Sequence, residues 1–286
     1  NTAVGVCALL TTTTSGNNAA FGFCALKTTS TDCNAAFGSN ALRDQTTGGC
    51  NTAVGSSAGL RTTSGDENTA VGKSALFTNT TGGQNTALGA LALDANTTGS
   101  QNVGLGNETL GTNTTGATNV AVGFAALNAN TTASANTAIG HRSLQANTTA
   151  ANNTAIGFCS LSANTTASAN TAVGTNALKT TTTGAENTAV GVGALDVNTA
   201  SYNTAMGVDA GGSNTSGTGN VFMGNAAGGA NTTASNNTAI GKDSLTTNTT
   251  GTGTAVGESS LKANTTGNYN TAVGNAALRD NTTADG

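Results

Sequence analysis

The stretch NTAIGFCSLSANTTASANTAVG, residues 153–174, contains the phrase Asn-Thr-Ala-(aliphatic)-Gly twice, seventeen residues apart. Aligned on this phrase, all 286 residues fall into seventeen consecutive units, fourteen of seventeen residues and three of sixteen. The unit reads Asn-Thr-Ala-Val-Gly-x-x-Ala-Leu-x-x-Asn-Thr-Thr-Gly/Ala-x-x, and we number its positions as columns one to seventeen. Such a fixed period is the signature of a repeat architecture. We therefore expect residues 1–286 to form a single continuous array without globular domains or capping units.

The composition excludes several classes of protein. Charged residues make up 8% of the chain, where about 25% is usual, and aromatic residues 3%. Proline and tryptophan are absent, 40 residues are glycine, and the net charge is −4. Nine scattered Lys and Arg give no electrostatic footprint for nucleic acid, and no apolar run approaches the ~18 residues that a membrane span needs. We expect neither a nucleic-acid partner nor membrane insertion.

The repeat predicts an all-β fold, a β-solenoid or β-roll of seventeen coils with one 16–17-residue repeat in each coil. Two large apolar residues per unit cannot form a helical stripe, and Asn, Thr and Gly are poor helix formers. Coils stacked at ~4.8 Å would place like residues above like in a rod of roughly 80 Å. Proline would be excluded because the next coil needs nearly every backbone N–H.

The core is predicted to consist of the aliphatic residue of column four and the leucine of column nine. Asn of column one and Thr of column two would form side-chain ladders from coil to coil. The representative core positions are Val4, Val54, Val71, Ile139, Ile156, Val173, Leu76, Leu127, Leu144 and Leu178.

Two further features suggest self-association. If column four points inward, strand alternation sends the small residues of column three outward, for close packing against another chain. A sharply curved coil with no room inside would explain these small residues equally well. The first and last units also stay in register, from which we expect end-to-end stacking with further copies, or a longer chain.

The phrases NTAIGFCSL and NTAVGKSAL resemble the head repeats of YadA-like trimeric autotransporter adhesins. They are still more similar to the NTAIG-type repeats of bacterial surface proteins and phage tail-fibre-like proteins. The resemblance implies a β-roll, often a homotrimer, on the outside of a cell or virion, where it serves in attachment or as a shaft. Surface glycans are a partner class consistent with such a role.

Four cysteines form two stacked pairs in the predicted solenoid. Cys7 and Cys24 share column seven, and Cys33 and Cys50 each directly precede a unit start. Neighbouring coils would place their Cα atoms ~4.8 Å apart, within the range of a disulfide. Disulfides would favour an oxidising, extracellular setting; the alternative is five free thiols in a reducing compartment.

Column twelve offers a second indication of function, because its Asn is the first residue of an Asn-x-Ser/Thr glycosylation pattern in eleven units. The alternative, which we favour, is an Asx turn that closes each coil. The candidate acceptors are Asn79, Asn96, Asn113, Asn130, Asn147, Asn164, Asn214, Asn231, Asn248, Asn264 and Asn281.

No catalytic, cofactor or metal site is predicted. Gly72-Lys73-Ser74 resembles the end of a phosphate-binding loop, but Glu67 stands where the earlier glycine is required. The chain has one histidine and no CxxC pair, which argues against a metal site. We expect a non-enzymatic protein without cofactors.

Three hypotheses for function follow. The first is a structural or adhesive extracellular fibre, glycosylated or not. The second is a carbohydrate-binding tail-fibre shaft. The third is an ice-binding solenoid, although adjacent threonines of columns thirteen and fourteen should face opposite sides and leave one outward rank.

Overall fold

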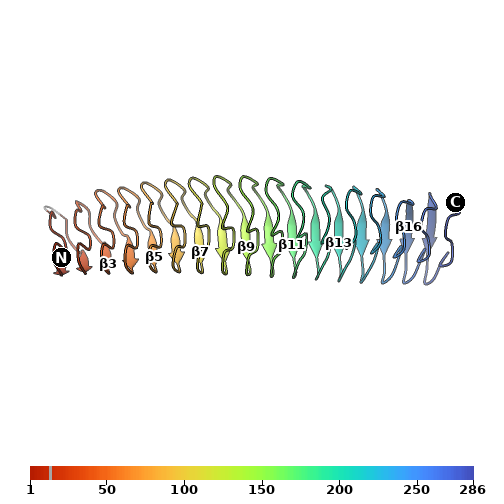
Figure 1. Ribbon diagram of the computed structural model, residues 1–286, viewed down its shortest axis with the longest axis horizontal. Helices are drawn as coiled ribbons and strands as arrows, with labels where there is room; N and C mark the ends of the chain where they lie inside the picture. The colour runs from red at the N-terminus through yellow and green to blue at the C-terminus, as the bar shows by residue number, and fades with distance from the viewer. Residues whose placement is uncertain (13–14) are drawn as a thin grey trace. The chain divides into compact units, whose positions relative to one another are not determined.

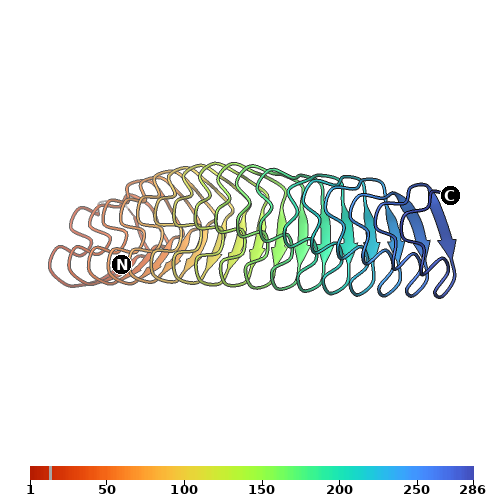
Figure 2. The same cartoon turned by 45° about the vertical axis from the view of Figure 1, so that its right-hand side comes forward.

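The computed structural model describes residues 1–12 and 15–286 and confirms the all-β solenoid. The chain forms two compact units, Asn1–Thr149 and Ala150–Gly286. In each unit every repeat makes one coil, which contributes one short strand (Figure 1). The strands form one wall of the coils, and irregular backbone forms the other walls (Figure 2).

The strands are three or four residues long and occupy columns one to four of each repeat. The first unit contains β1 (Thr2–Val4), β2 (Ala19–Phe21), β3 (Ala35–Phe37), β4 (Thr52–Val54), β5 (Thr69–Val71), β6 (Thr86–Leu88), β7 (Val103–Leu105), β8 (Val120–Val122) and β9 (Thr137–Ile139). The second contains β10 (Thr154–Ile156), β11 (Thr171–Val173), β12 (Thr188–Val190), β13 (Thr204–Met206), β14 (Val221–Met223), β15 (Thr238–Ile240), β16 (Gly253–Val256) and β17 (Asn270–Val273).

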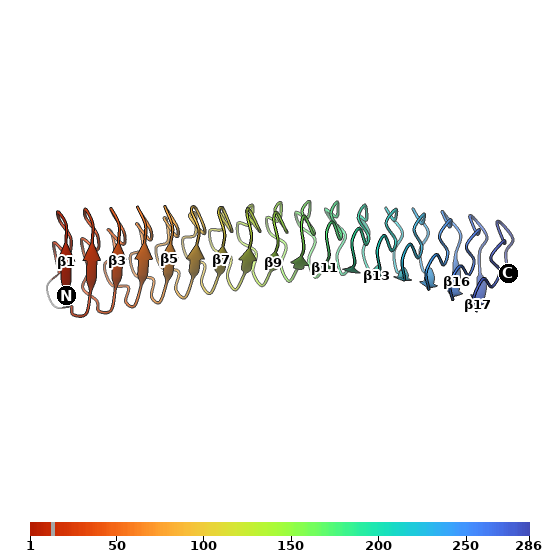
Figure 3. The same ribbon diagram turned by 90° about the horizontal axis from the view of Figure 1, so that it is seen from below.

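Consecutive strands within each unit pair in parallel, with each residue opposite its copy in the next repeat. For β5 and β6 the register is Thr69 with Thr86, Ala70 with Ala87, and Val71 with Leu88. Strands of one unit therefore succeed each other in chain order (Figure 3). One full coil of the chain connects each strand to the next. The length of the repeat therefore sets the register between neighbouring strands.

The interior of the coil is built from alanine and leucine. Ala70, Ala75 and Leu76, in columns three, eight and nine, are 0–2% exposed, and the same columns are buried in nearly every coil. Leu76, Leu127, Leu144 and Leu178 are all fully buried, which confirms the leucine part of the predicted core. The small residues of columns three and eight fill a narrow coil, so the prediction that column three faces outward is wrong.

The predicted inward orientation of column four is also wrong. Strand alternation holds, but with the opposite phase: the alanine before it is buried and the column-four side chain faces outward. The six positions predicted as core are half-buried or exposed instead, namely Val4, Val54, Val71, Ile139, Ile156 and Val173. The buried apolar residues of columns three, eight and nine already form three files in the interior, where a file is the set of residues in one column of successive coils.

Glycine in column five is required by backbone contact between coils. Gly72 has φ +136°, a conformation that is essentially restricted to glycine. A Cβ atom added there would lie 2.5 Å from the carbonyl oxygen of Gly89 in the next coil. The column is glycine throughout because the coils touch at this corner.

Each coil is supported by side-chain hydrogen bonds from two files of buried asparagine rather than by charged residues. In column one, the N–H of Asn85 donates to Oδ1 of Asn68 (3.0 Å), and its Nδ2 donates to the same atom (3.1 Å) and to Gly99 O (2.9 Å). In column twelve, Asn113 Nδ2 donates to Asn96 Oδ1 (2.8 Å). The predicted ladder of column-one asparagines is confirmed, whereas over the described residues the column-two threonines, such as Thr69, form no side-chain ladder. Threonine hydroxyls bond from coil to coil in column thirteen, where Thr97 Oγ1 donates to Thr114 O (2.9 Å).

Candidate functional site

The most extensive surface feature is the outward column-four file. Column four is apolar in all seventeen repeats, and none of its side chains is buried. Leu88 is 47% exposed, Met206 46% and Ile139 37%. The rings of Phe21 and Phe37, in adjacent coils, stack with their centroids 5.0 Å apart and an interplanar angle of 6°. Each unit therefore presents an apolar ridge on the outer side of its strands.

Column six, two residues further along the chain, adds exposed apolar side chains in several coils. Its exposed apolar members are Val6, Phe23, Phe124, Phe158, Val192 and Val208. At about 4.8 Å per coil, the nine column-four residues of the first unit, Val4 to Ile139, carry the ridge over about 38 Å. Exposed apolar patches of this extent mark interaction sites more often than scattered single residues do.

Charged groups are few and dispersed. In the described ranges, ion pairs join Arg43 to Asp44 (2.7 Å), Lys262 to Asp243 (3.1 Å) and Arg279 to Asp280 (3.9 Å), all with side chains at least partly exposed. The hydrogen bond to Asp44 raises the pKa of the Arg43 guanidinium.

Two aspartates in column ten are partly desolvated. Burial raises the pKa of Asp94 and that of Asp196, and Oδ1 of Asp196 is buried without a hydrogen-bond partner. Asp94 belongs to the first unit and Asp196 to the second.

Over residues 1–12 and 15–286, no three His, Cys, Asp or Glu side chains lie together in a way that could hold a metal ion. No helix in the same ranges has the length and hydropathy that a bilayer-spanning segment needs.

The candidate glycosylation sites lie inside the coil. Ten of the eleven asparagines are 0–1% exposed, and Asn281 is half-buried. Their amide nitrogens donate to the turn, as Asn96 Nδ2 does to Gly99 O (2.9 Å). This geometry supports the Asx-turn interpretation, because a sugar could reach such a nitrogen only before the coil closes. The exposed hydroxyl at this corner is that of the column-fourteen threonine, such as Thr98.

The five cysteines are free thiols in the structure. Cys24 N–H donates to Val6 O (2.9 Å) and Cys50 N–H to Asp32 O (3.3 Å), so each predicted pair occupies adjacent coils. Desolvation raises the pKa of Cys50, and the neighbouring Cys33 thiol raises it further. Disulfides between Cys7 and Cys24 and between Cys33 and Cys50 stay a prediction.

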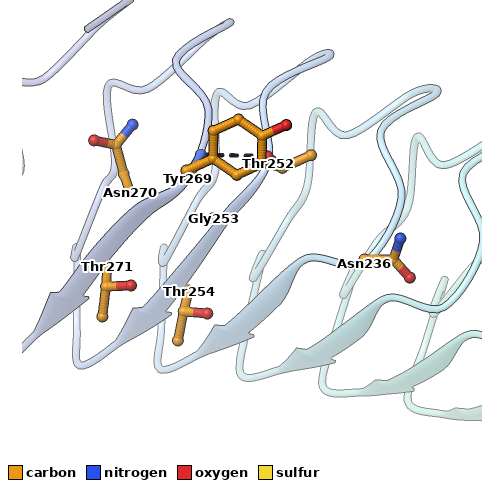
Figure 4. Close-up of a pocket in the computed structure, with 7 residues that line it drawn as sticks. All are labelled: Asn236, Thr252, Gly253, Thr254, Tyr269, Asn270 and Thr271. Atoms are coloured by element: carbon orange, nitrogen blue, oxygen red, sulfur yellow. Dashed lines mark hydrogen bonds between the residues drawn. The ribbon is translucent and has the colours of Figure 1, made fainter. Parts of the chain in front are cut away.

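An open hollow of about 450 Å³ lies beside β16 and β17 in the second unit (Figure 4). Its lining residues are Asn236, Thr252, Gly253, Thr254, Tyr269, Asn270 and Thr271. None of these side chains is charged, and Tyr269 is 81% exposed. The repeat pattern did not predict this hollow, although the departure of Gly253 from the column-one consensus could have pointed to it.

A scan against models of protein families, a search of curated proteins and a search of solved structures each found no match.

Proposed function

We propose that this chain is a structural, adhesive segment of an extracellular fibre, in which copies of the solenoid associate side by side through the column-four file. The observation that carries the proposal is the uninterrupted apolar ridge on each unit, built from a column that is apolar in all seventeen repeats. The fold does not use this ridge for its core, because alanine and leucine fill the interior. An outward apolar column maintained from coil to coil is consistent with burial against a partner.

A further copy of the same chain is the partner that fits best. The ridge has side chains at about 4.8 Å intervals, the spacing of the coils. A partner that fills the grooves between them over many coils needs the same period, which another copy has. Two copies of the chain would meet with their side chains at equal intervals. This gives the shape complementarity that stable interfaces show. The resemblance to trimeric adhesin heads supports a trimer as the assembly.

Two features support placement outside the cell or on a virion. The stacked cysteine pairs would be joined in an oxidising compartment. The repeats also resemble those of exported surface proteins. Disulfide mapping of protein isolated from its native source tests this part: free thiols on all five cysteines would contradict it.

Sedimentation and electron microscopy test the assembly. We expect the protein to sediment as a trimer, or another defined oligomer, with side-by-side solenoids visible in negative stain. Changing Val54, Leu88 and Ile139 together to lysine should shift the equilibrium toward monomer by at least tenfold. Each residue is 37–47% exposed, so the folded coil accommodates the longer side chain.

The matched control changes Thr81, Thr98 and Thr115 to lysine. These column-fourteen threonines are exposed at a different corner of the coil, and the added charge is the same. The control variant should keep the wild-type oligomeric state. A wild-type protein that stays monomeric at about 0.1 mM, or a control that dissociates equally, would overturn the proposal.

A further inference from the structure

One departure from the repeat lies at the hollow beside β16 and β17. Sixteen of the seventeen repeats begin with Asn, and the exception is Gly253. The repeat that Gly253 begins ends in Tyr269, in a column where the residue varies from repeat to repeat. Gly253 and Tyr269 both line the hollow. In an array where stacking favours like residues in each file, the loss of asparagine at this position points to a local role.

Gly253 changes how these two coils are joined. Elsewhere the column-one N–H donates to the asparagine side chain of the preceding coil, as Gly253 itself does to Asn237 Oδ1 (2.7 Å). Gly253 offers no such acceptor to the next coil. The strands β16 and β17 instead begin one residue earlier than the other strands and pair from Gly253 to Asn270. The backbone pairing therefore extends up to the wall of the hollow.

The fold gives no reason for a tyrosine at position 269. The side chain is 81% exposed and therefore buries little apolar surface. Its φ of +59° is shared by the last residue of other repeats, such as Gln84 with +60°, so the coil sets this conformation. The ring is left in solvent beside the hollow, where its apolar face and its hydroxyl are available to a ligand.

The other groups around the hollow are neutral donors and acceptors. The Tyr269 N–H donates to Thr252 Oγ1 (3.3 Å), while the hydroxyls of Thr254 and Thr271 lie on the outer face of the two strands (Figure 4). The amide of Asn236 stands at the opposite side. A hydroxyl both donates and accepts, and an amide offers two donors and an acceptor. Such groups match a ligand rich in hydroxyls better than they match an ion.

We infer that this hollow binds a neutral saccharide, with the Tyr269 ring against the apolar face of a sugar ring and Thr254, Thr271 and Asn236 bonded to its hydroxyls. The volume of about 450 Å³ lies within the ~300–1,000 Å³ that is common for ligand sites. Tyrosine suits this role because it combines a rigid apolar face with a polar tip. The inference adds a ligand and does not rest on lateral association.

The chain contains two tyrosines and no tryptophan, so tyrosine fluorescence reports on the site directly. In a Tyr202→Phe variant, Tyr269 is the sole tyrosine. We expect its emission to change in a saturable way on titration with at least one member of a panel of neutral oligosaccharides built from glucose, galactose, mannose or N-acetylglucosamine. A sialylated oligosaccharide and an uncharged peptide serve as comparison probes.

Calorimetric titration with the saccharide so identified then compares substitutions. Tyr269→Ala should weaken binding at least about tenfold, and Tyr269→Phe should retain most of the affinity. Tyr202→Ala is the matched control, because Tyr202 occupies the same column with φ +65° and is 62% exposed but does not line the hollow. Circular dichroism verifies that each variant is folded.

Three results would overturn the inference. They are no response to any neutral saccharide at about 10 mM, equal binding by Tyr269→Ala and wild type, and a response to the sialylated or peptide probe alone. None of these results bears on the oligomeric state, so the proposed assembly is judged separately.

Discussion

Leucine in column nine takes a backbone conformation that L-residues usually avoid. All fourteen such leucines have φ between +44° and +53°, in the left-handed region where non-glycine residues are uncommon. The sharp turn directs the side chain into the coil, where Leu76 is fully buried. Burial of a large apolar side chain, worth about 1.5–3 kcal/mol, offsets the cost of this backbone conformation.

Three residues show how tightly the interior is filled. Phe222 replaces the usual column-three residue and is fully buried. The column-nine leucine is replaced by glycine in the same repeat and in the one before it, at Gly228 and Gly211. A Cβ atom at Gly211 would lie 2.5 Å from the Phe222 ring. One large ring therefore occupies the space of two leucines.

Changing Phe222→Ala should lower the free energy of unfolding by about 3–5 kcal/mol, because it leaves a cavity between two coils. Adding Gly211→Leu and Gly228→Leu should restore much of this loss, since both positions already have φ near +60°. Gly211→Leu alone should destabilise the protein by a clash with the ring. Denaturant titration followed by circular dichroism measures all three, and a cost below about 1 kcal/mol for Phe222→Ala would contradict the packing described.

The strand is too short to be stable by itself, so each element depends on its neighbours above and below. A three-residue strand such as Thr69–Val71 offers few backbone hydrogen bonds. The asparagine files add to them at two corners of the same coil. Because buried polar groups need partners, the files keep asparagine in register through successive coils.

Asn113→Ala should destabilise the first unit by about 1–3 kcal/mol for each buried group that loses its partner. Its amide nitrogen donates to Asn96 Oδ1 (2.8 Å) and Gly116 O (3.0 Å), and its Oδ1 accepts from Asn130 Nδ2 (2.7 Å). Hydrogen exchange should increase most in the coils on either side.

Thr115→Ala, two residues away and exposed, is the control for this change. We expect it to alter the free energy of unfolding by no more than about 0.5 kcal/mol. Equal effects of the two substitutions would mean that the asparagine file is not a principal support of the coil.

At the scale of the whole molecule, the chain is held by apolar packing and neutral hydrogen bonds. Its net charge is −4 over 286 residues. The three ion pairs in the described ranges lie at least partly in solvent, where such pairs contribute about 0–1 kcal/mol each. Long-range electrostatics therefore have little part in stability.

Raising NaCl from about 0.05 to 0.5 M should leave the unfolding midpoint nearly unchanged, because salt screens interactions that this protein scarcely uses. Sodium sulfate at the same ionic strength should raise the midpoint, since sulfate strengthens apolar burial. Thermal denaturation at low protein concentration measures both. A strong loss of stability in NaCl would show that charge pairs matter more than the structure indicates.

The sequence by itself determined the repeat, the single coil per unit, the parallel register, the column-nine leucine core and the column-one asparagine ladder. These features follow from periodicity, because a stack of equal coils places like residues above like. The sequence also shows that column five is always glycine. The reason, contact with the backbone of the next coil, follows only from the structure.

Only the tertiary structure decided which face of the strand points inward. Alternation requires that Ala70 and Val71 point to opposite sides, but it does not say which side is the core. The larger side chain is the natural choice for burial from hydrophobicity alone. The coil is too narrow for it, because Ala70, Ala75 and Leu76 already fill the interior at 0–2% exposure. The same lack of room turns column four into an outer ridge, and burial of column twelve makes its asparagines turn residues rather than accessible acceptors.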